Sequence, residues 1–287
     1  MAEKKYPVLR FFLKLSFIIF IFFLGFSLAH YALEKGMLIT GEKVGILEIK
    51  GIIKSSNPTL NNLVKLAENK HIKAVVLRVD SPGGVVGPSQ EIYLEIMRMR
   101  KKKPIVASLG SVAASGGYYI ASAANEIITS PGTITGSIGV KMEFINIQEL
   151  LKKLGLGQEV IKSGTFKDIG SPIRRMSEEE KALLEKLIKD VHKQFVKAIA
   201  KGRNLSLDKV QEIADGRIFT GEEAKKLGLV DKLGNFQDAI TLAAKLGGIK
   251  GKPSTFYLKE KKSFLDMFFS NFLEFLNKNE KALKFQW

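Results

Sequence analysis

"AVVLRVDSPGGVVGPSQEIYLEIMRMR", residues 74–100, contains the unit from which we expect the fold to be built. Ala74–Val79 is rich in β-branched and apolar side chains, which is typical of a buried strand. The Gly83-Gly84 pair predicts a tight turn, and Ser89–Arg100 has the apolar spacing of a helix. Such a turn leaves free backbone N–H groups at the start of the helix. These groups suit an oxyanion or another anion, although an ordinary tight turn gives the same pattern.

The same alternation of apolar runs and helical patterns continues on both sides of this stretch and predicts a single α/β domain of βαβ units. Further strands are expected at Val44–Ile49, Ile105–Ser108, Glu126–Thr129 and Val160–Lys162. Further helices are expected at Leu60–Asn69, Ser115–Ala124, Ile147–Lys153 and after Ser177, where Glu180 completes a capping box. Residues 215–234 are expected to form a turn, a short strand, a helix and another turn.

An apolar segment near the N-terminus, Leu15–Leu33, contains no Asp, Glu, Lys or Arg and is long enough to cross a bilayer as a helix. Four basic residues and one acidic residue precede it, so the positive-inside rule predicts a cytoplasmic N-terminus and an extracytoplasmic main domain. The alternative is a cleaved signal peptide with its cleavage site near Ser27–Ala29. We favour the anchor because the apolar run continues past that site.

Composition excludes several classes of site. The chain has no cysteine, which rules out a thiol nucleophile, a cysteine zinc site and disulfides. The formal net charge is +16, but the basic residues are scattered along helical stretches without a nucleic-acid-binding signature, so we expect a solvated surface and no nucleic-acid partner. The three histidines, His30, His71 and His192, lie in contexts that do not fit a catalytic base. They are not clustered, so no metal site is predicted.

A second glycine-rich stretch, "ASLGSVAASGGYYIA" at residues 107–121, contains three serines among small residues. Close packing of helices would explain the small residues as well as a catalytic turn would. Without a suitable histidine or cysteine, the remaining nucleophilic chemistry is a serine activated by a neutral lysine. Lys167, in "IKSGTFKDIGSP", lies in a loop rich in small residues after the strand expected at Val160–Lys162. Lys162 competes on the same grounds, and the residues around the two lysines do not choose between them.

Five motifs occur in order between Val44 and Leu246: "DSPGG", "GSVAASGGYYIA", "PGTITGSIGV", "KSGTFKDIGSP" and "ADGRIFTGEEAKKLGLVD". Together with the apolar segment, they resemble the signal peptide peptidase A family of membrane-anchored serine-lysine peptidases. The resemblance implies a fold similar to that of the Clp protease subunit and the crotonases, with repeated β-β-α units after one transmembrane helix.

The resemblance also implies roles for individual residues. The serine of "AASGG", Ser115, would be the nucleophile, and Lys167 rather than Lys162 would be the general base. Ser137 of "GSIG" would hydrogen-bond the lysine and orient it. The oxyanion hole would use the N–H of Gly83 or Gly84 and that of Gly116.

The implied activity is an endopeptidase that degrades remnant signal peptides and other unstructured apolar peptides, without a cofactor. A homo-oligomer is expected, an octamer by resemblance, in which Ser115 and Lys167 pair across subunits. The alternatives are a stomatin-partner type of Ser-Lys protease, a crotonase-like acyl-transfer enzyme and a non-catalytic membrane scaffold. The expected organisation is a basic N-terminus at 1–14, the anchor at 15–33, the peptidase domain at 34–250 and a tail at 251–287. The tail has an amphipathic pattern that fits a membrane interface or a docking face equally well.

Overall fold

A computed structural model describes residues 7–34 and 41–258 of the chain. The N-terminal helix α1 spans Pro7–Glu34 and confirms the helix expected there. Within it, Phe11–Ala29 is long and apolar enough to cross a membrane, and none of this stretch is buried. The amphipathic part of the predicted tail lies outside the described residues.

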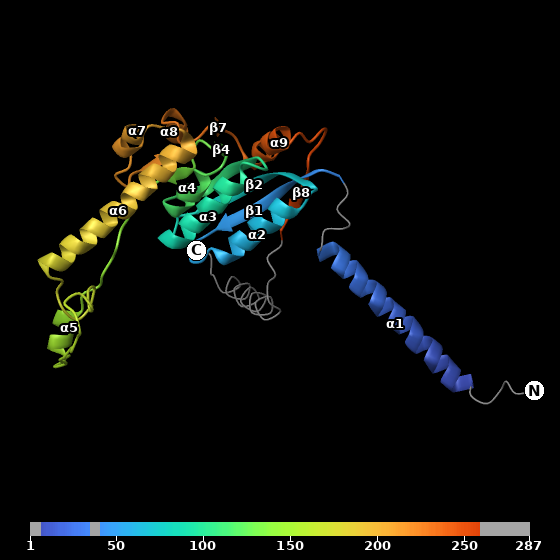
Figure 1. The fold of residues 1–287 in the computed structure, drawn as a ribbon, viewed down its shortest axis with the longest axis horizontal. Helices are drawn as coiled ribbons and strands as arrows, with labels where there is room; N and C mark the ends of the chain where they lie inside the picture. The colour runs from blue at the N-terminus through green and yellow to red at the C-terminus, as the bar shows by residue number, and fades with distance from the viewer. Residues whose placement is uncertain (1–6, 35–40, 259–287) are drawn as a thin grey trace, which may run out of the picture. The chain divides into compact units, whose positions relative to one another are not determined.

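The domain after this helix is built on a mostly parallel sheet with the strand order β6-β5-β3-β2-β1-β8 (Figure 1). The three central strands are parallel: β1 (Lys43–Lys50), β2 (Ile72–Ser81) and β3 (Ile105–Ala114). The remaining strands are β4 (Glu126–Thr129), β5 (Ile134–Gly136), β6 (Ile218–Thr220), β7 (Lys232–Leu233) and β8 (Ser254–Tyr257). Of these, β4 and β5 both run parallel to β3, β4 along its first half and β5 along its second.

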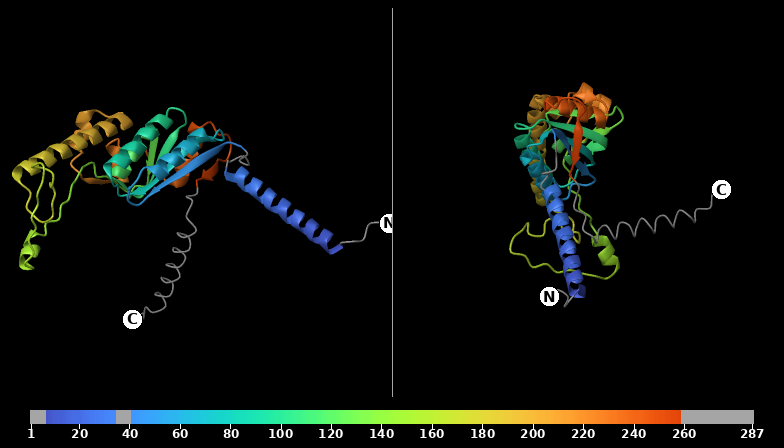
Figure 2. Two further views of the ribbon diagram at one scale, coloured as in Figure 1. Left: turned by 60° about the horizontal axis from the view of Figure 1, so that its bottom comes forward. Right: turned by 90° about the vertical axis from the view of Figure 1, so that its right-hand side faces the viewer.

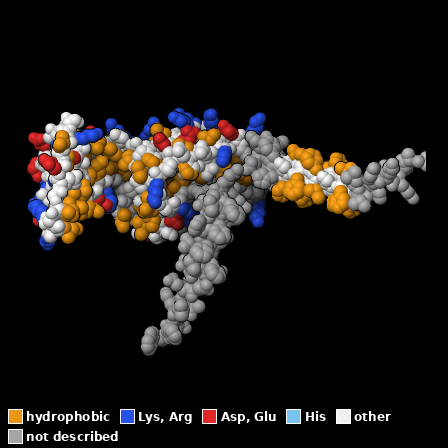
Figure 3. Space-filling model, turned by 90° about the horizontal axis from the view of Figure 1, so that it is seen from below, with side chains coloured by type: hydrophobic (Ala, Val, Ile, Leu, Met, Phe, Trp, Pro, Cys, Tyr) orange, Lys and Arg blue, Asp and Glu red, His pale blue; other side chains and the backbone are white. Residues whose placement is uncertain are grey.

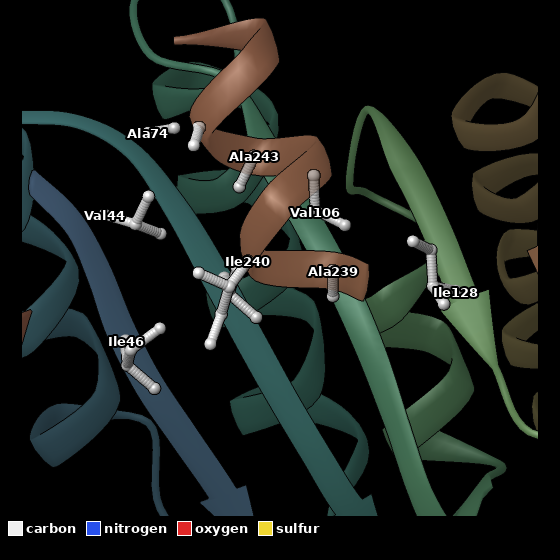
Figure 4. Packing of buried hydrophobic residues seen from close by; sticks show 10 residues of the cluster. Val44, Ile46, Ala74, Val106, Ile128, Ala239, Ile240 and Ala243 are labelled. Carbon is white, nitrogen blue, oxygen red and sulfur yellow. The ribbon is translucent and has the colours of Figure 1, made fainter. Parts of the chain in front are cut away.

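Helices cover both faces of this sheet. On one face, α2 (Asn57–Glu68) packs on β1 and β2, α4 (Gly116–Ala121) packs on β2 and β3, and α3 (Val86–Met99) packs between the two helices. On the other face, α9 (Phe236–Leu246) crosses β1, β2 and β3, as Figure 4 shows. The strands are therefore apolar on both faces, and Val44, Ile46, Ala74 and Val76 alternate with side chains that face α2 and α4.

The longest helix of the domain, α6 (Glu178–Arg203), connects the sheet to a projecting segment that carries α5 (Gln148–Lys153) (Figures 1 and 2). The C-terminal part of α6 packs against α3 and α4, where the Tyr93 hydroxyl donates a 2.8 Å hydrogen bond to Ala198 O. The short helices α7 (Leu207–Glu212) and α8 (Gly221–Lys226) follow α6. α8 packs on β5, β6 and β7.

The expected α/β fold with a mostly parallel sheet is confirmed. The capping box at the start of α6 and the bounds of β4 are as predicted. The strand expected at Val160–Lys162 is wrong, because this stretch belongs to the projecting segment and has no neighbouring strand with which to pair. Ile161 there is 98% exposed. The third strand is longer than predicted and runs to Ala114, directly before Ser115.

Candidate active site

Ser115 occupies a sharp turn between β3 and α4. Its backbone has φ 50° and ψ −121°, a conformation that costs free energy for a residue with a side chain. Ser115 and Ser137 are two of only three non-glycine residues with positive φ in the described chain. The Ser115 N–H donates a 2.9 Å hydrogen bond to Gly136 O, which continues the β3–β5 pairing into the turn. The half-buried side chain is held at a strand-to-helix junction, the arrangement used to present a nucleophilic serine.

The glycine turn after β2 packs directly on the Ser115 turn. Gly83 has φ 101°, and a Cβ atom added to it would lie 2.6 Å from the Gly116 nitrogen and 2.9 Å from Ser115 Cβ. A Cβ atom added to Gly116 would lie 2.7 Å from Ser89 Oγ and 3.2 Å from the Gly84 nitrogen. A side chain at position 83 would collide with the backbone of Gly116, and one at position 116 would collide with the Ser89 side chain and press on the Gly84 backbone. Glycine at both positions therefore lets the two turns come this close.

The close approach brings two backbone amides together. The Gly83 N–H donates a 3.1 Å hydrogen bond to the buried Ser81 Oγ, which itself donates to Gly51 O at 2.6 Å. In the described part of the chain, the N–H groups of Gly84 and Gly116 have no hydrogen-bond acceptor. Of the predicted oxyanion donors, Gly84 and Gly116 therefore have N–H groups free to bind substrate, and Gly83 does not.

A bulge in β3 sets the direction of the strand that ends at Ser115. The pairing of β2 with β3 shifts register after Val79, and Asp80 fills the space that opens. Its Oδ1 accepts a 3.1 Å hydrogen bond from the Val112 N–H, and a Cβ atom added to Gly110 would lie 2.7 Å from its Cγ. The Asp80 carboxylate thus holds the second half of β3 in the course that pairs it with β5.

Ser137 lies one residue beyond the carbonyl that binds the Ser115 N–H. Its own N–H donates a 2.8 Å hydrogen bond to Arg217 O, because β5 pairs antiparallel with β6. The Arg217 guanidinium binds both carboxylate oxygens of Asp215, and this interaction lowers the pKa of Asp215 to about 2. The "GSIG" and "DGRIF" motifs, distant in the sequence, therefore form one rigid turn beside Ser115.

Lys167 lies elsewhere, in an exposed turn of the projecting segment between α5 and α6 (Figure 1). Its backbone N–H donates to Gly164 O at 3.1 Å, and no hydrogen bond joins its side chain to Ser115 or to any other described residue. Lys162, the competing lysine, donates to Asp168 Oδ1 at 2.6 Å. Within one chain, the structure brings Ser115, Ser137 and the glycines together but does not bring Lys167 to them.

Comparison with known proteins identifies the family to which this geometry belongs. The model of peptidase family S49 matches residues 97–250, more than half of the chain, and the Clp protease model matches residues 45–133. The chain belongs to peptidase family S49. It is a serine peptidase with a Clp-protease-like α/β fold, as the motifs predicted.

Three relatives illustrate what this chain is similar to. A Synechocystis protein named "Putative protease" is 46% identical over 211 residues, covering 73% of this chain and 76% of the relative. A Methanocaldococcus jannaschii protein, also named "Putative protease", is 39% identical over 215 residues, covering 75% and 69%. The "Putative signal peptide peptidase SppA" of Enterococcus faecium is 36% identical over 234 residues, covering 77% and 67%.

Sequence reasoning missed several residues that shape this S49 site. Asp80 and Ser81 lie in the "DSPGG" motif, but the sequence predicts only a turn there. Arg174 and Glu180 form an ion pair beside the Lys167 turn, and the sequence pattern predicts only the helix cap that Glu180 provides. For Asp80 and Ser81, the available signal is a carboxylate and a hydroxyl just before the Gly83-Gly84 turn. In the described ranges, no group of three or more His, Asp or Glu residues is arranged to hold a metal ion.

Proposed function

We propose that this S49 peptidase is a membrane-anchored endopeptidase in which Ser115 is the nucleophile and Lys167 the general base. The observation that carries the proposal is the strained turn at Ser115 packed against two free amides, those of Gly84 and Gly116. A serine in such a turn can reach a peptide carbonyl while both amides point at the oxygen of that carbonyl.

The chemistry follows from these groups. Ser115 Oγ attacks the scissile carbonyl carbon while the neutral Lys167 Nζ takes the hydroxyl proton. The carbonyl oxygen becomes an oxyanion and accepts hydrogen bonds from Gly84 and Gly116. Lys167 then gives the proton to the leaving amine, and the C–N bond breaks to leave an ester on Ser115. Water, deprotonated by the same lysine, then attacks the carbonyl carbon of that ester. The C–Oγ bond breaks, the acid leaves, and the lysine returns its proton to Ser115 Oγ. The Ser137 hydroxyl orients the lysine.

The two halves of the dyad would meet between subunits. Lys167 makes no contact with Ser115 within one described chain, and the segment that carries it exposes many large apolar side chains (Figure 3). These are Phe144, Ile145, Leu150, Leu154, Leu156, Ile161 and Phe166. A second copy of the chain is the occupant that would both cover this surface and receive Lys167, and the expected assembly is a ring-like octamer. The neighbour would also remove water from the lysine, which favours its neutral form.

The location of the substrate follows from the N-terminal helix. We take α1 as an uncleaved anchor with its basic end in the cytoplasm and the peptidase domain outside. Remnant signal peptides and other unstructured apolar peptides are then the expected substrates. This agrees with the name of the Enterococcus relative. A protein that starts at residue 42 should be soluble and retain activity on a short peptide.

The decisive experiment compares the full-length chain in detergent with Ser115→Ala and with Ser111→Ala, using a fluorogenic apolar peptide. Ser111 is exposed on the same strand and serves as the matched control. Ser115→Ala should be inactive and should not react with a serine-directed phosphonate, while Ser111→Ala should behave as wild type. Activity or labelling that persists in Ser115→Ala would refute the proposal.

The subunit arrangement has its own test. Ser115→Ala and Lys167→Ala chains, each inactive alone, are mixed before assembly. Restored activity is expected, because some interfaces would pair an intact serine with an intact lysine. Co-assembly without any restored activity would show that each site is built within one chain.

A further inference from the structure

A network of charged side chains surrounds the turn that carries Lys167. The Arg174 guanidinium binds Asp168 through Nε at 2.8 Å and Nη2 at 2.9 Å. The same guanidinium binds Glu180, with Nη1 donating to Oε2 at 2.8 Å and Nη2 donating to Oε1. Arg174 therefore joins the residue directly after Lys167 to the first turn of α6.

Glu180 is the fixed end of this network. It is only 2% exposed, and it forms a capping box with Ser177 through hydrogen bonds of 2.8 and 3.2 Å. The hydrogen bonds from Arg174 lower the pKa of Glu180 to about 2, so the carboxylate stays ionised at working pH. Because α6 packs against α4 at its other end, the helix provides a rigid base for the turn.

Lys162 closes the network on the other side of Lys167. Its Nζ donates to Thr165 O at 2.9 Å and to Asp168 Oδ1 at 2.6 Å, two groups that flank Lys167 in the chain. Arg174 Nη2 also donates to the backbone oxygen of Asp168 at 3.2 Å. The turn is thus held from both sides, while the Lys167 side chain stays exposed and makes no ion pair with any described residue.

We propose that Arg174 and Glu180, acting through Asp168, are positioning residues that hold Lys167 in the geometry for proton transfer from Ser115. The proposal rests on the proposed function, in which Lys167 is the general base. The network has a second effect. Lys162 and Arg174 donate hydrogen bonds to the Asp168 carboxylate, and this keeps the carboxylate from forming an ion pair with Lys167. A carboxylate paired with an amine favours its protonated, inactive form.

The first measurement is the kcat and KM of full-length Arg174→Gln on the fluorogenic peptide. Since a misplacement of about 1 Å can cost about 10²-fold in rate, we expect kcat to fall by about 10- to 100-fold. KM should stay within about twofold, because the network contacts neither the Ser115 turn nor the glycine amides. Arg174→Lys keeps the positive charge but lacks the planar guanidinium that binds Asp168 and Glu180 at the same time. Its kcat should therefore lie between those of Arg174→Gln and wild type.

Two variants in the first turn of α6 provide the matched control. Glu180→Gln removes the carboxylate that holds Arg174, and Glu178→Gln removes a carboxylate that is 87% exposed and pairs only with Lys181. Both remove one negative charge from the first turn of α6, near the positive end of the helix dipole. Only Glu180→Gln should lower kcat, and the Arg174→Gln/Glu180→Gln double variant should be no worse than either single change, because the residues act as one unit.

The pH profile separates positioning from a merely structural role. The charged groups facing Asp168 in the described chain are Lys162 and Arg174, and Glu180 faces Arg174. In Arg174→Gln the Asp168 carboxylate loses a partner and becomes available to Lys167, so half-maximal activity should move to higher pH. Adding Asp168→Asn should move it back. A structural defect would lower the rate without moving the profile.

The outcomes distinguish this inference from the proposed function. If Lys167→Ala keeps wild-type activity, the proposed function fails. If Lys167→Ala is inactive while Arg174→Gln and Glu180→Gln keep wild-type kcat and pH profile, the dyad stands and the positioning network is refuted. An equal loss in Glu178→Gln and Glu180→Gln would also refute it, since helix stability alone would then explain both.

Discussion

Gly83→Ala tests whether the close approach of the two glycine turns forms the oxyanion site. At φ 101° an alanine is strained, which costs about 1–3 kcal/mol. Its Cβ atom would lie 2.6 Å from the Gly116 nitrogen, about 0.8 Å inside the 3.4 Å at which ordinary contact begins. The obstacle is backbone, so one of the two turns has to move.

The size of that movement sets the expected loss of rate. Oxyanion donors act over a window of about 2.7–3.1 Å, so a displacement of about 0.8 Å takes the Gly116 N–H out of range. Losing one such donor costs about 10²–10³-fold in kcat. The strain is smaller than the roughly 5–15 kcal/mol that stabilises a typical domain, so the protein stays folded and unfolding cannot account for the loss.

Gly87→Ala is the matched control for this experiment. It makes the same change four residues further on, in α3, where an added Cβ atom meets nothing within 4 Å and φ is not positive. Helical alanine is more stable than glycine by about 0.5–1 kcal/mol, so this variant should keep its activity and melt no lower than wild type. Peptide hydrolysis and thermal unfolding followed by circular dichroism are measured for all three proteins. A Gly83→Ala enzyme with kcat within about threefold of wild type would refute the reasoning.

Three further outcomes are expected. Lys167→Arg should lower kcat by about 10²–10⁴-fold at every pH tested, because a guanidinium stays charged; a rate that recovers at alkaline pH would contradict this. The pKa of Glu180 is lowered to about 2, so its ionised form stabilises the fold above pH 4.5 and this contribution is lost as the pH falls toward 2. The melting temperature of Glu180→Gln should therefore lie below that of wild type at neutral pH and converge with it in acid, whereas Glu178→Gln should follow wild type throughout. Tyr118→Phe should lower the free energy of unfolding by about 1–3 kcal/mol in urea titrations, because it leaves the buried Leu229 carbonyl without its 2.8 Å hydrogen bond; an unchanged midpoint would show that the carbonyl finds another donor.

Features encoded over a few neighbouring residues were predictable from the sequence. The order of strands, glycine turns and helices in the central sheet, the apolar N-terminal helix and the Ser177–Glu180 capping box all match the structure. Each depends on side-chain periodicity, glycine freedom or a cap three residues long, and these act before any distant contact forms. The motifs also identified the peptidase family and singled out Ser115, whose strained turn the structure then describes.

The tertiary structure decided features that depend on distant partners. Val160–Lys162 has the composition of a strand, but no neighbouring strand lies beside it. Neighbouring glycines such as Gly83 and Gly84 look alike in sequence, and in the structure the Ser81 hydroxyl accepts a hydrogen bond from the amide of Gly83 but not from that of Gly84.

The two lysines were separated in the same way. Lys162 and Lys167 share one loop, and the structure pairs Lys162 with Asp168, which Arg174 links to α6. Lys167 is left without a partner among the described residues. The physical reason is that a hydrogen bond or ion pair depends on distance, and the distance between residues far apart in the chain is set by strand register and helix packing, which no local pattern encodes.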